Sequence, residues 1–451
     1  MKGRPRPPEA RRSAFKILRR VEEGGAYASV LLEREEMGFP DPRDSALLHE
    51  LVLGVLRNQV LLDDVLSRVA SRPVALIDPP IRTALRIGAY EILFLDRVPA
   101  FATVDSAVDL VKRSGFRAGA GFVNAVLRAV AAQESGRLPS PPERGDVSRL
   151  ALLHSHPRWW VERAVNRLGW DEAVRLLEAN NAQAATVLRP NLRRTTPRDL
   201  ALRLEAEGVM TEPCRFLPEA LRVRSGVAQR TRTFHEGYAW IQDEASQLAA
   251  RLFGRVLRPR VADVCAAPGA KALQLAQSLP TPGILLAADR HVGRLGRLRQ
   301  NLRRLKIDNV LVVAADMTAR PPLRGPFDHV LVDAPCSGTG TLRRHPEIRW
   351  RLTPEDLTSL ANRQAKLLHT AAGLLRCGGT LVYSVCSLEP EEGEQVVTGF
   401  LSRHPGFRPV DPRPALPETA RDLIGGDGAF RTSPAEGGLD GFYAALLLRE
   451  G

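Results

Sequence analysis

The chain has 451 residues, 44% of them hydrophobic, which allows two or three domains with full cores and excludes a disordered or fibrous protein. Its formal net charge of +13 favours a partner with a phosphate backbone, although a generally arginine-rich proteome would give the same excess. No apolar run approaches the roughly 18 residues of a membrane helix, and MKGRPRPPEARR precedes no signal-peptide core. We therefore expect a cytoplasmic protein without a membrane partner.

The cysteines indicate neither a metal site nor a disulfide framework. No two of them form a C-x-x-C pair, which argues against zinc, and an odd number in a cytoplasmic chain argues against disulfides. The thiols therefore serve either core packing or thiol chemistry. They are Cys214, Cys265, Cys336, Cys377 and Cys386.

Residues 10–134 repeat the helical spacing of apolar side chains. The pattern is carried by SAFKILRRVEEG, LLHELVLGVLRN, IRTALRIGAYEILFL, TVDSAVDLVKRS and GFVNAVLRAVAAQ. Because their apolar faces can close on one another without a sheet, we predict an all-α bundle over residues 1–140 that folds alone. A linker rich in proline, glycine and charge follows at 134–146.

The rest of the chain changes character twice. Residues 147–235 mix two helical segments with short strands and turns, which predicts a small α+β domain. Residues 236–451 contain five apolar strands separated by helical patterns, which predicts an α/β domain whose parallel sheet is covered on both faces. The strands are RVADVCAAPGA, GILLAADR, NVLVVAADM, FDHVLVDAP and GGTLVYSVCS, and GFYAALLLR at 441–449 reads as a late strand.

The turn after the first of these strands has features of a ligand site. CAAPGAK (265–271) leads from strand to helix, and its glycine lets a ligand approach free backbone N–H groups, although no G-x-G-x-x-G motif is present. The second strand ends in Asp289 and the third in Asp316, and an acid at the end of the second strand suits a ribose diol. Each acid could instead cap a turn. Together with Asp333 they favour a nucleotide-like cofactor.

Two cysteines follow the fourth and fifth strands. If those strands are neighbours, about 4.8 Å apart, Cys336 and Cys386 face one crevice at the carboxyl ends of the sheet. The alternative is that both thiols pack as small apolar side chains, which the flanking Pro335 and the adjacent serines disfavour.

Two thiols beside an adenosine-type pocket suit methylation of cytosine at carbon 5. That carbon is too electron-poor to attack a methyl donor until a thiolate adds to carbon 6, and a base must later remove the carbon-5 proton so that the thiol can leave. A free thiol, with a pKa of about 8.5, is only slightly ionised at neutral pH, so the site has to activate it. Asp333 could balance charge at N3 of the base.

Four motifs carry a resemblance to a known family. DVCAAPGAK, DAPCSGTGTLRRHPEIRW, YSVCSLEPEE and DGFYAALLLRE resemble the RsmB (Fmu/Sun) family of RNA cytosine-C5 methyltransferases, and the similarity covers nearly the whole chain. The N-terminal bundle is similar to the RNA-binding domain of the antitermination factor NusB. The resemblance implies a Rossmann-like catalytic domain, S-adenosyl-L-methionine as cofactor, and a cytosine of small-subunit (16S) ribosomal RNA as substrate.

The resemblance also implies residue roles, which the chemistry alone leaves open. Cys386 becomes the nucleophile and Cys336 assists release of the methylated base. Because DNA cytosine-C5 methyltransferases attack with the Pro-Cys thiol, the second cysteine favours RNA. For Asp333 a cofactor contact competes with the role at N3, and for Cys265 packing is the alternative. The implied cofactor contacts are Cys265, Ala266, Ala267, Pro268, Gly269, Ala270, Lys271, Asp289, Asp316 and Asp333. We expect no metal, and a monomer.

The chain departs from the family pattern at three positions. The family usually reads CAAPGGKT, where this chain has Ala270 and Ala272, and has threonine where Val385 precedes the nucleophile. These changes concern cofactor affinity rather than the reaction class. Two other functions stay open: a tRNA cytosine-C5 methyltransferase, and an RNA-binding ribosome-assembly factor that has lost activity. The sequence does not name the target cytosine.

Two further features have a functional and a structural interpretation. The stretch 290–306 holds six arginines and one lysine without an acid, so Arg297 and Arg304 are candidates for phosphate contacts, with a solvated helix face as the alternative. His154, His156, Trp159 and Trp160 could stack on RNA, with helix packing as the favoured alternative.

Overall fold

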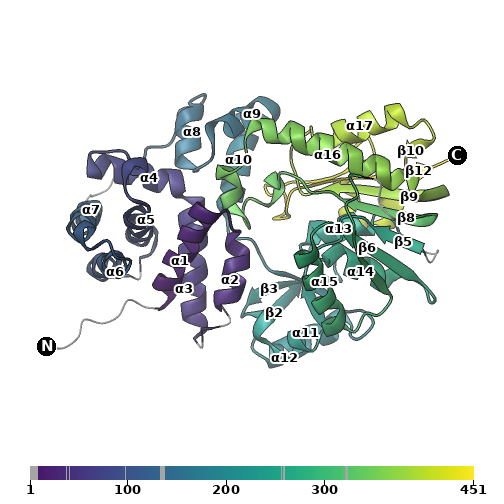
Figure 1. Ribbon diagram of the computed structural model, residues 1–451, viewed down its shortest axis with the longest axis horizontal. Helices are drawn as coiled ribbons and strands as arrows, with labels where there is room; N and C mark the ends of the chain where they lie inside the picture. Colours follow the sequence, from purple (N-terminus) through teal and green to yellow (C-terminus); the bar gives the residue numbers. More distant parts are fainter. Residues whose placement is uncertain are drawn as a thin grey trace. The chain divides into compact units, whose positions relative to one another are not determined.

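The chain folds into two compact units in the computed structural model: residues 1–182 together with 342–351, and residues 183–341 together with 352–451. The structure describes residues 9–450 apart from 37, 40, 97, 133–137, 255, 257–259 and 320–322. The basic N-terminal arm and the start of the linker expected at 134–146 lie outside the described residues. Figure 1 shows the elements in chain order.

The first unit is built from helices. They are α1 (Glu9–Gly24), α2 (Ala28–Glu36), α3 (Pro42–Arg57), α4 (Gln59–Ala70), α5 (Pro79–Phe94), α6 (Ala100–Arg113), α7 (Ala120–Ala132), α8 (Val147–Leu153), α9 (Arg158–Leu168), α10 (Trp170–Asn181) and the short η5 (Pro346–Trp350). The apolar faces of α1 to α7 enclose one core, as their spacing predicted. At Gly54 a Cβ would lie 2.1 Å from the Tyr90 ring, so α3 and α5 cross closely there only because Gly54 has no side chain.

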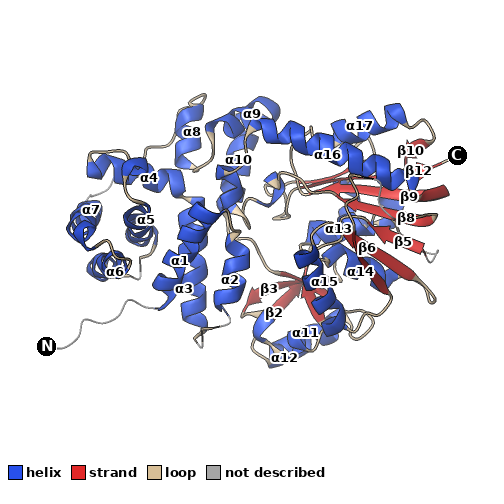
Figure 2. Ribbon diagram, viewed as in Figure 1, coloured by secondary structure: helices blue, strands red, loops and turns tan. Residues whose placement is uncertain are grey.

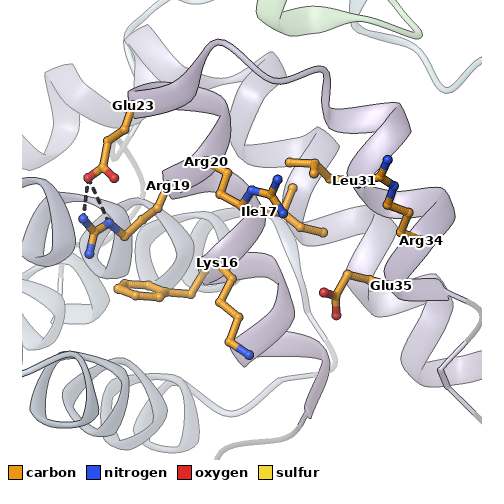
Figure 3. A pocket seen from close by; sticks show the side chains of 9 residues that line it. Lys16, Ile17, Arg19, Arg20, Glu23, Leu31, Arg34 and Glu35 are labelled. Carbon is orange, nitrogen blue, oxygen red and sulfur yellow. Dashed lines mark hydrogen bonds and ion pairs between the residues drawn. The ribbon is translucent and has the colours of Figure 1, made fainter. Parts of the chain in front are cut away.

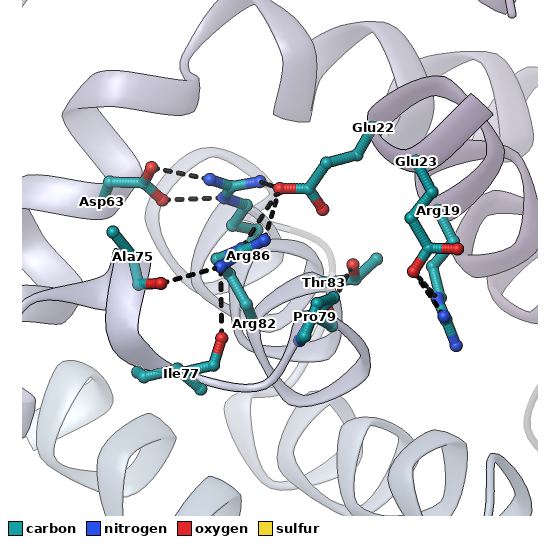
Figure 4. Close-up of polar contacts among 10 residues, drawn as sticks. All are labelled: Arg19, Glu22, Glu23, Asp63, Ala75, Ile77, Pro79, Arg82, Thr83 and Arg86. Atoms are coloured by element: carbon teal, nitrogen blue, oxygen red, sulfur yellow. Dashed lines mark hydrogen bonds and ion pairs between the residues drawn. The ribbon is translucent and has the colours of Figure 1, made fainter. Parts of the chain in front are cut away.

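A buried cation ties three helices of this core together. Arg86 on α5 donates to both carboxylate oxygens of Asp63 on α4, each at 2.7 Å, and to Glu22 on α1 at 3.1 Å. Arg82, one turn earlier, donates to the same Glu22 oxygen (Figure 4). Burial makes such a cation costly unless its donors are paired, so this network fixes the positions of α1, α4 and α5.

The second unit begins with a small antiparallel sheet of order β2-β3-β1-β4, with α11 (Pro197–Ala206) and α12 (Arg232–His235). Its strands are short: β1 (Val187–Pro190), β2 (Met210–Pro213), β3 (Leu221–Ser225) and β4 (Ala239–Ile241). Leu188, Leu200, Leu221 and their neighbours form a core of their own. The strands and turns expected within residues 147–235 lie in this part, whereas the two helical segments expected there, α9 and α10, belong to the first unit.

The second unit continues as a large sheet of order β10-β12-β9-β8-β5-β6-β7, with β11 paired to β12. Five of its strands run parallel, β12 is antiparallel to β9, and helices lie on both faces (Figure 2). One face packs on α13 (Glu244–Arg251), α14 (Ala270–Ser278) and α15 (Val292–Leu305), the other on α16 (Pro354–Gly373) and α17 (Glu394–Arg403). The strands are β5 (Arg260–Asp263), β6 (Ile284–Asp289), β7 (Val310–Ala314), β8 (Phe327–Asp333), β9 (Leu375–Val385), β10 (Phe407–Pro409), β11 (Phe430–Thr432) and β12 (Phe442–Arg449).

This architecture confirms the predicted Rossmann-like α/β fold preceded by an all-α bundle, with one difference in detail. The described residues between β7 and β8 form no helix, although a helical pattern was expected between all the strands. Among the described helices, no single one is long and apolar enough to cross a membrane; only α3 and α4 taken together, across a 77° bend, meet the length and composition that a span requires.

Candidate active site

The two cysteines of interest lie side by side at the carboxyl edge of the sheet. Strands β8 and β9 are parallel neighbours with Asp333 opposite Ser384, so the chain leaves both strands at the same level. Their following residues bring the Cys336 and Cys386 Sγ atoms to 3.4 Å from each other. Both side chains are partly buried. Two thiols that are 50 residues apart in the sequence can therefore address one ligand.

The two thiols interact through the hydrogen bond between them. The hydrogen bond with Cys386 raises the pKa of Cys336 well above its usual range, and burial raises it further. Cys336 therefore keeps its proton at neutral pH and can donate it in a hydrogen bond to Cys386. A thiolate is stabilised by such a donor.

The turn between β5 and α14 is held in place by neighbouring strands and by α15. The Ala267 N–H donates to Asp289 Oδ2 at 3.2 Å, and Arg294 Nη2 donates to the Ala267 carbonyl at 2.6 Å. Gly269 has φ +124°, and a Cβ there would lie 2.5 Å from Leu298 Cδ1, so only glycine fits. Ala270 does not share this left-handed backbone, so its extra methyl group brings no backbone strain.

The three acids expected at strand ends have different surroundings. Asp289 is 6% exposed, and besides the Ala267 bond its Oδ1 accepts from the His291 N–H at 2.8 Å. Asp316 is exposed, and hydrogen bonds from the Thr318 side chain and backbone lower the pKa of its carboxyl. Asp316 thus caps its own turn, as the structural alternative anticipated. Asp289 instead supports the 265–271 turn.

Asp333 forms a buried ion pair with a residue of the same turn. Lys271 Nζ lies 2.9 Å from Asp333 Oδ1, and Ser384 Oγ donates to the same oxygen at 2.7 Å. The ammonium group also lies 4.7 Å from the centre of the Phe442 ring. The Asp333 side chain keeps 32% of its surface exposed, which leaves it accessible to a ligand.

Asp263, the last residue of β5, was missed by the sequence analysis. It is 1% exposed, and its Oδ1 accepts from the Cys265 N–H at 3.2 Å, whereas Oδ2 has no hydrogen-bond partner within the described part of the chain. Burial, and secondarily the negative charge of Asp333, raise the pKa of Asp263 to about 8. A buried carboxyl oxygen without a partner beside a ligand turn fits a ligand that carries N–H or O–H donors. Because Asp263 ends a predicted strand, as Asp289 does, the sequence pattern could have identified it as a candidate site residue.

Other side chains singled out in the sequence have structural surroundings. His156 and Trp160 are 2% and 3% exposed and stack at 5.4 Å, so they pack in the helical unit. Burial raises the pKa of the Cys265 thiol, which therefore stays neutral. Cys214 is buried, and Cys377 is exposed.

The arginine-rich stretch forms α15 and divides into two groups. Arg304 Nη1 donates to the carbonyls of Phe234 and Ala239, and the guanidinium lies 4.4 Å from the centre of the Phe234 ring. Arg304 therefore supports the fold, as Arg294 does at the 265–271 turn. Arg299 and Arg303 are exposed and remain candidates for a polyanionic partner.

The helical unit has a basic hollow between α1 and α2. Four basic, two acidic and three apolar side chains line it, and Arg19 is paired to Glu23 (Figure 3). The lining residues are Phe15, Lys16, Ile17, Arg19, Arg20, Glu23, Leu31, Arg34 and Glu35.

The large sheet, the strand-to-helix turn and the acids at the strand ends define the class of Rossmann-like methyltransferases. Three family models agree: residues 256–448 match the 16S rRNA methyltransferase RsmB/F model, 8–132 match the NusB family, and 156–229 match the ferredoxin-like domain of RsmF/B-like methyltransferases. The chain belongs to the RsmB/F family of methyltransferases, which confirms the resemblance carried by its four motifs.

Relatives and solved structures match along most of the chain. It is 33% identical to the probable ribosomal RNA small subunit methyltransferase B of Synechocystis, over 97% of this chain and 99% of that one. It is 35% identical to the ribosomal RNA small subunit methyltransferase B of Pseudomonas putida, over 97% and 98%. The crystal structure of PH0851 is similar with a TM-score of 0.85 and 25% identity, covering 99% and 100%. A methyltransferase homolog from Pyrococcus horikoshii gives a TM-score of 0.57 and 28% identity, covering 68% and 99%.

Proposed function

We propose that the protein transfers a methyl group from S-adenosyl-L-methionine to carbon 5 of a cytosine in small-subunit ribosomal RNA, through a covalent bond between a cysteine and the base. The observation that carries this proposal is the pair of thiols, 3.4 Å apart, at the carboxyl ends of β8 and β9 in a methyltransferase of the RsmB/F family. The names of the relatives support the rRNA substrate. In this proposal the protein works in the cytoplasm as a monomer.

Cys386 is the nucleophile in this mechanism. Its thiolate adds to carbon 6, which makes carbon 5 nucleophilic enough to take the methyl group. This order rests on the resemblance of the YSVCS and APCSG motifs to the family, and the 3.4 Å separation of the Sγ atoms lets a protonated Cys336 stabilise a thiolate on Cys386 by a hydrogen bond.

Cys336 then serves as the base for elimination. Once Cys386 is bonded to carbon 6 it no longer offers a thiolate, and the interaction that most raises the pKa of Cys336 is lost. Cys336 then gives its own proton to solvent, and the resulting thiolate takes the proton from carbon 5. The electron pair of that C–H bond restores the ring double bond, and the bond from Cys386 Sγ to carbon 6 breaks.

The cofactor site in this proposal comprises the 265–271 turn, Asp289, Asp316, Asp333 and the additional Asp263. S-adenosylmethionine supplies an electrophilic methyl group when bound. Asp289 hydrogen-bonds the ribose hydroxyls, since each carboxylate oxygen that accepts one N–H retains a second lone pair. Asp263 Oδ2, which has no partner among the described residues, would hydrogen-bond a polar group of the cofactor.

Asp333 has two candidate roles, a cofactor contact and a hydrogen bond at N3 of cytosine. The variant Asp333→Asn separates them. Weaker binding of S-adenosylmethionine in calorimetry assigns Asp333 to the cofactor, whereas normal binding with a lower kcat assigns it to the base.

We further propose that residues 1–140 bind RNA, that 147–235 form the second domain, and that 236–451 carry the chemistry. The match of residues 8–132 to the NusB family and the basic hollow between α1 and α2 support the first assignment. Bisulfite sequencing of rRNA and tRNA from cells with and without the gene tests the substrate. A lost methylcytosine in tRNA alone points to the tRNA enzyme, and absence of S-adenosylmethionine binding points to the assembly factor.

The division of roles between the thiols predicts different outcomes for their variants. Cys386→Ser should lose methylation and form no covalent complex, because a hydroxyl is far less ionised than a thiol. Cys336→Ala should still attack and methylate, so it should accumulate a protein–RNA adduct that carries labelled methyl and survives a denaturing gel. Cys377→Ala, at an exposed cysteine, is the matched control and should behave as wild type. An adduct in Cys386→Ser rather than in Cys336→Ala would show that Cys336 is the nucleophile and Cys386 the base.

A further inference from the structure

Each of the two cysteines is followed by a serine, and both serine hydroxyls meet the same carboxylate. Ser387 Oγ donates to Glu392 Oε2 at 2.6 Å, and Ser337 Oγ donates to the same oxygen. The two hydroxyl oxygens lie 3.1 Å from each other. Glu392 is 0% exposed, so these bonds form away from solvent.

The second oxygen of this carboxylate holds the backbone of the Cys336 loop. Glu392 Oε1 accepts from the Ser337 N–H at 2.8 Å and from Gln364 Nε2 at 2.9 Å. Gln364 also donates to the Pro335 carbonyl at 3.0 Å, so the residues on both sides of Cys336 are fixed. The Tyr383 hydroxyl, on β9, donates to the Glu392 carbonyl at 2.5 Å and fixes the carboxylate's own backbone.

Additional hydrogen bonds join the loops directly, among them one between the Thr339 and Ser387 hydroxyls at 3.3 Å. The Gly340 N–H donates to the Cys386 carbonyl at 3.1 Å, and the Leu388 N–H donates to Thr339 Oγ1 at 2.9 Å. Glu392 is nevertheless the one group among the described residues that takes donors from the residue after each cysteine, with two bonds on each oxygen.

We propose that Glu392 is a positioning residue that sets the separation of the two thiols by binding Ser337 and Ser387 at once. This inference deepens the proposed function and rests on it. Glu392 acts through the two serines. A buried carboxylate suits the task because it offers only acceptors, and both loops present donors to it. The side chain of an aspartate at this position would be one methylene too short to reach both loops.

A crosslinking experiment tests this geometry without relying on methylation. Diamide oxidises two neighbouring thiols to a disulfide, taking up their two electrons and two protons as it becomes a hydrazine. In the wild-type protein the Cys336–Cys386 disulfide should form readily, and its rate is measured by mass spectrometry after alkylation. Glu392→Ala should slow it by about 100-fold, in line with the cost of displacing a reacting group by about 1 Å. Glu394→Ala, at an exposed carboxylate of the same segment, is the matched control and should crosslink at the wild-type rate.

The variant Glu392→Gln separates positioning from charge. Its Oε1 keeps the bonds from Ser337 N and Gln364, while its Nε2 donates to the serine hydroxyls, which can turn and accept. We expect it to crosslink and to methylate within about threefold of wild type, whereas Glu392→Asp should resemble Glu392→Ala. Its pH–rate profile should superpose on that of the wild type.

Methylation kinetics complete the test. Glu392→Ala should lower kcat by about 100-fold while the S-adenosylmethionine Kd and the KM for RNA stay unchanged. Crosslinking of Glu392→Ala at the wild-type rate would overturn the inference, as would a Glu392→Gln enzyme that crosslinks normally but is inactive. If the wild-type protein makes no 5-methylcytosine, the proposed function fails, while the crosslinking rates still decide the role of Glu392.

Discussion

Among single residues, Asp263 is a buried acid near the candidate site with one oxygen unpartnered among the described residues. One oxygen accepts the Cys265 N–H and the other has no partner, and burial raises the pKa of the carboxyl to about 8. At neutral pH the group is therefore mostly protonated in the folded protein. In the unfolded chain it would titrate near the ordinary value of 3.8.

This shift predicts how stability changes with pH. Between about pH 4 and 8 the folded protein holds a proton that the unfolded chain releases, so the contribution of Asp263 to stability falls as pH rises. Asp263→Asn removes that dependence. The free energy of unfolding of the variant minus that of the wild type should be larger at pH 8 than at pH 5.5, by up to about 3 kcal/mol. The Tm difference between the two proteins should change in the same direction. Calorimetry at both pH values measures it, and the same Tm difference at both would contradict the shift.

Arginines on α15 should differ in what they do for RNA binding. Arg304 is tied to two backbone carbonyls, and burial lowers its pKa to about 10. Arg304→Ala should therefore cost about 2 kcal/mol of stability without changing the salt dependence of RNA affinity. Arg299→Ala and Arg303→Ala should each lower the slope of log affinity against log salt by about 1. An unchanged slope in both would assign α15 to a solvated face.

At the scale of elements, the sequence predicted the five parallel strands because each is a short apolar run with a helix or turn on either side. It could not predict that β8 and β9 are neighbours, since strand order depends on contacts distant in sequence. The 3.4 Å approach of the two thiols was therefore only a conditional expectation. Glu392 was missed for a similar reason: its acidic surroundings in LEPEEGE read as an exposed turn, and its burial depends on donors from another loop.

The segment Leu342–Arg351 lies between Cys336 and α16 in the sequence. It nevertheless belongs to the helical unit, where Arg343, Arg349 and Glu347 are buried. Arg349 donates to the carbonyls of Arg57, Ser155 and Asn180 and to Asn181 Oδ1, at 2.7–3.2 Å. Glu347 accepts from the Ala28 N–H at 2.9 Å. Charged residues seldom lie inside a unit, so composition gave no signal for this burial.

The burial of Arg349 predicts a large effect on stability. Arg349→Ala leaves four acceptors without a donor and should destabilise the helical unit by about 3–5 kcal/mol. Arg349→Lys should not restore it, because an ammonium group cannot reach acceptors in several directions as the planar fork does. Hydrogen exchange in α3 and α10 measures the effect. Arg158→Ala, at an exposed pair with Glu162, is the control and should change stability by less than about 0.5 kcal/mol.

At the scale of the whole molecule, we expect residues 1–140 to do more than the sequence predicts. The sequence predicts a bundle that folds alone and adds RNA affinity without chemistry. Yet the helical unit also includes α8 to α10 and the segment 342–351, which follows Cys336 by only a few residues. Arg351, at the end of that segment, donates to the carbonyls of Val21, Gly25 and Ala26.

Deleting residues 1–140 should therefore lower kcat as well as RNA affinity. The deletion removes the partners of Glu347 and Arg351, so the chain beyond Cys336 loses its support. Binding of S-adenosylmethionine, measured by calorimetry, should persist, because the 265–271 turn keeps its own contacts. A truncated enzyme with an unchanged kcat at saturating RNA would show that the bundle supplies affinity alone.

The position of residues 342–351 in the sequence also determines when the helical unit can be completed during translation. They complete the helical unit, whose first part ends at Ala182. Residue 342 is the 160th residue to be synthesised after residue 182 (342 − 182). At about 5–20 residues per second this is a delay of about 8–32 s. During that interval the Ala28 N–H and the carbonyls of Arg57 and Ser155 can pair only with water. The first part of the protein to be translated is thus among the last to reach its final form, and a nascent chain stopped at residue 341 carries an unfinished surface.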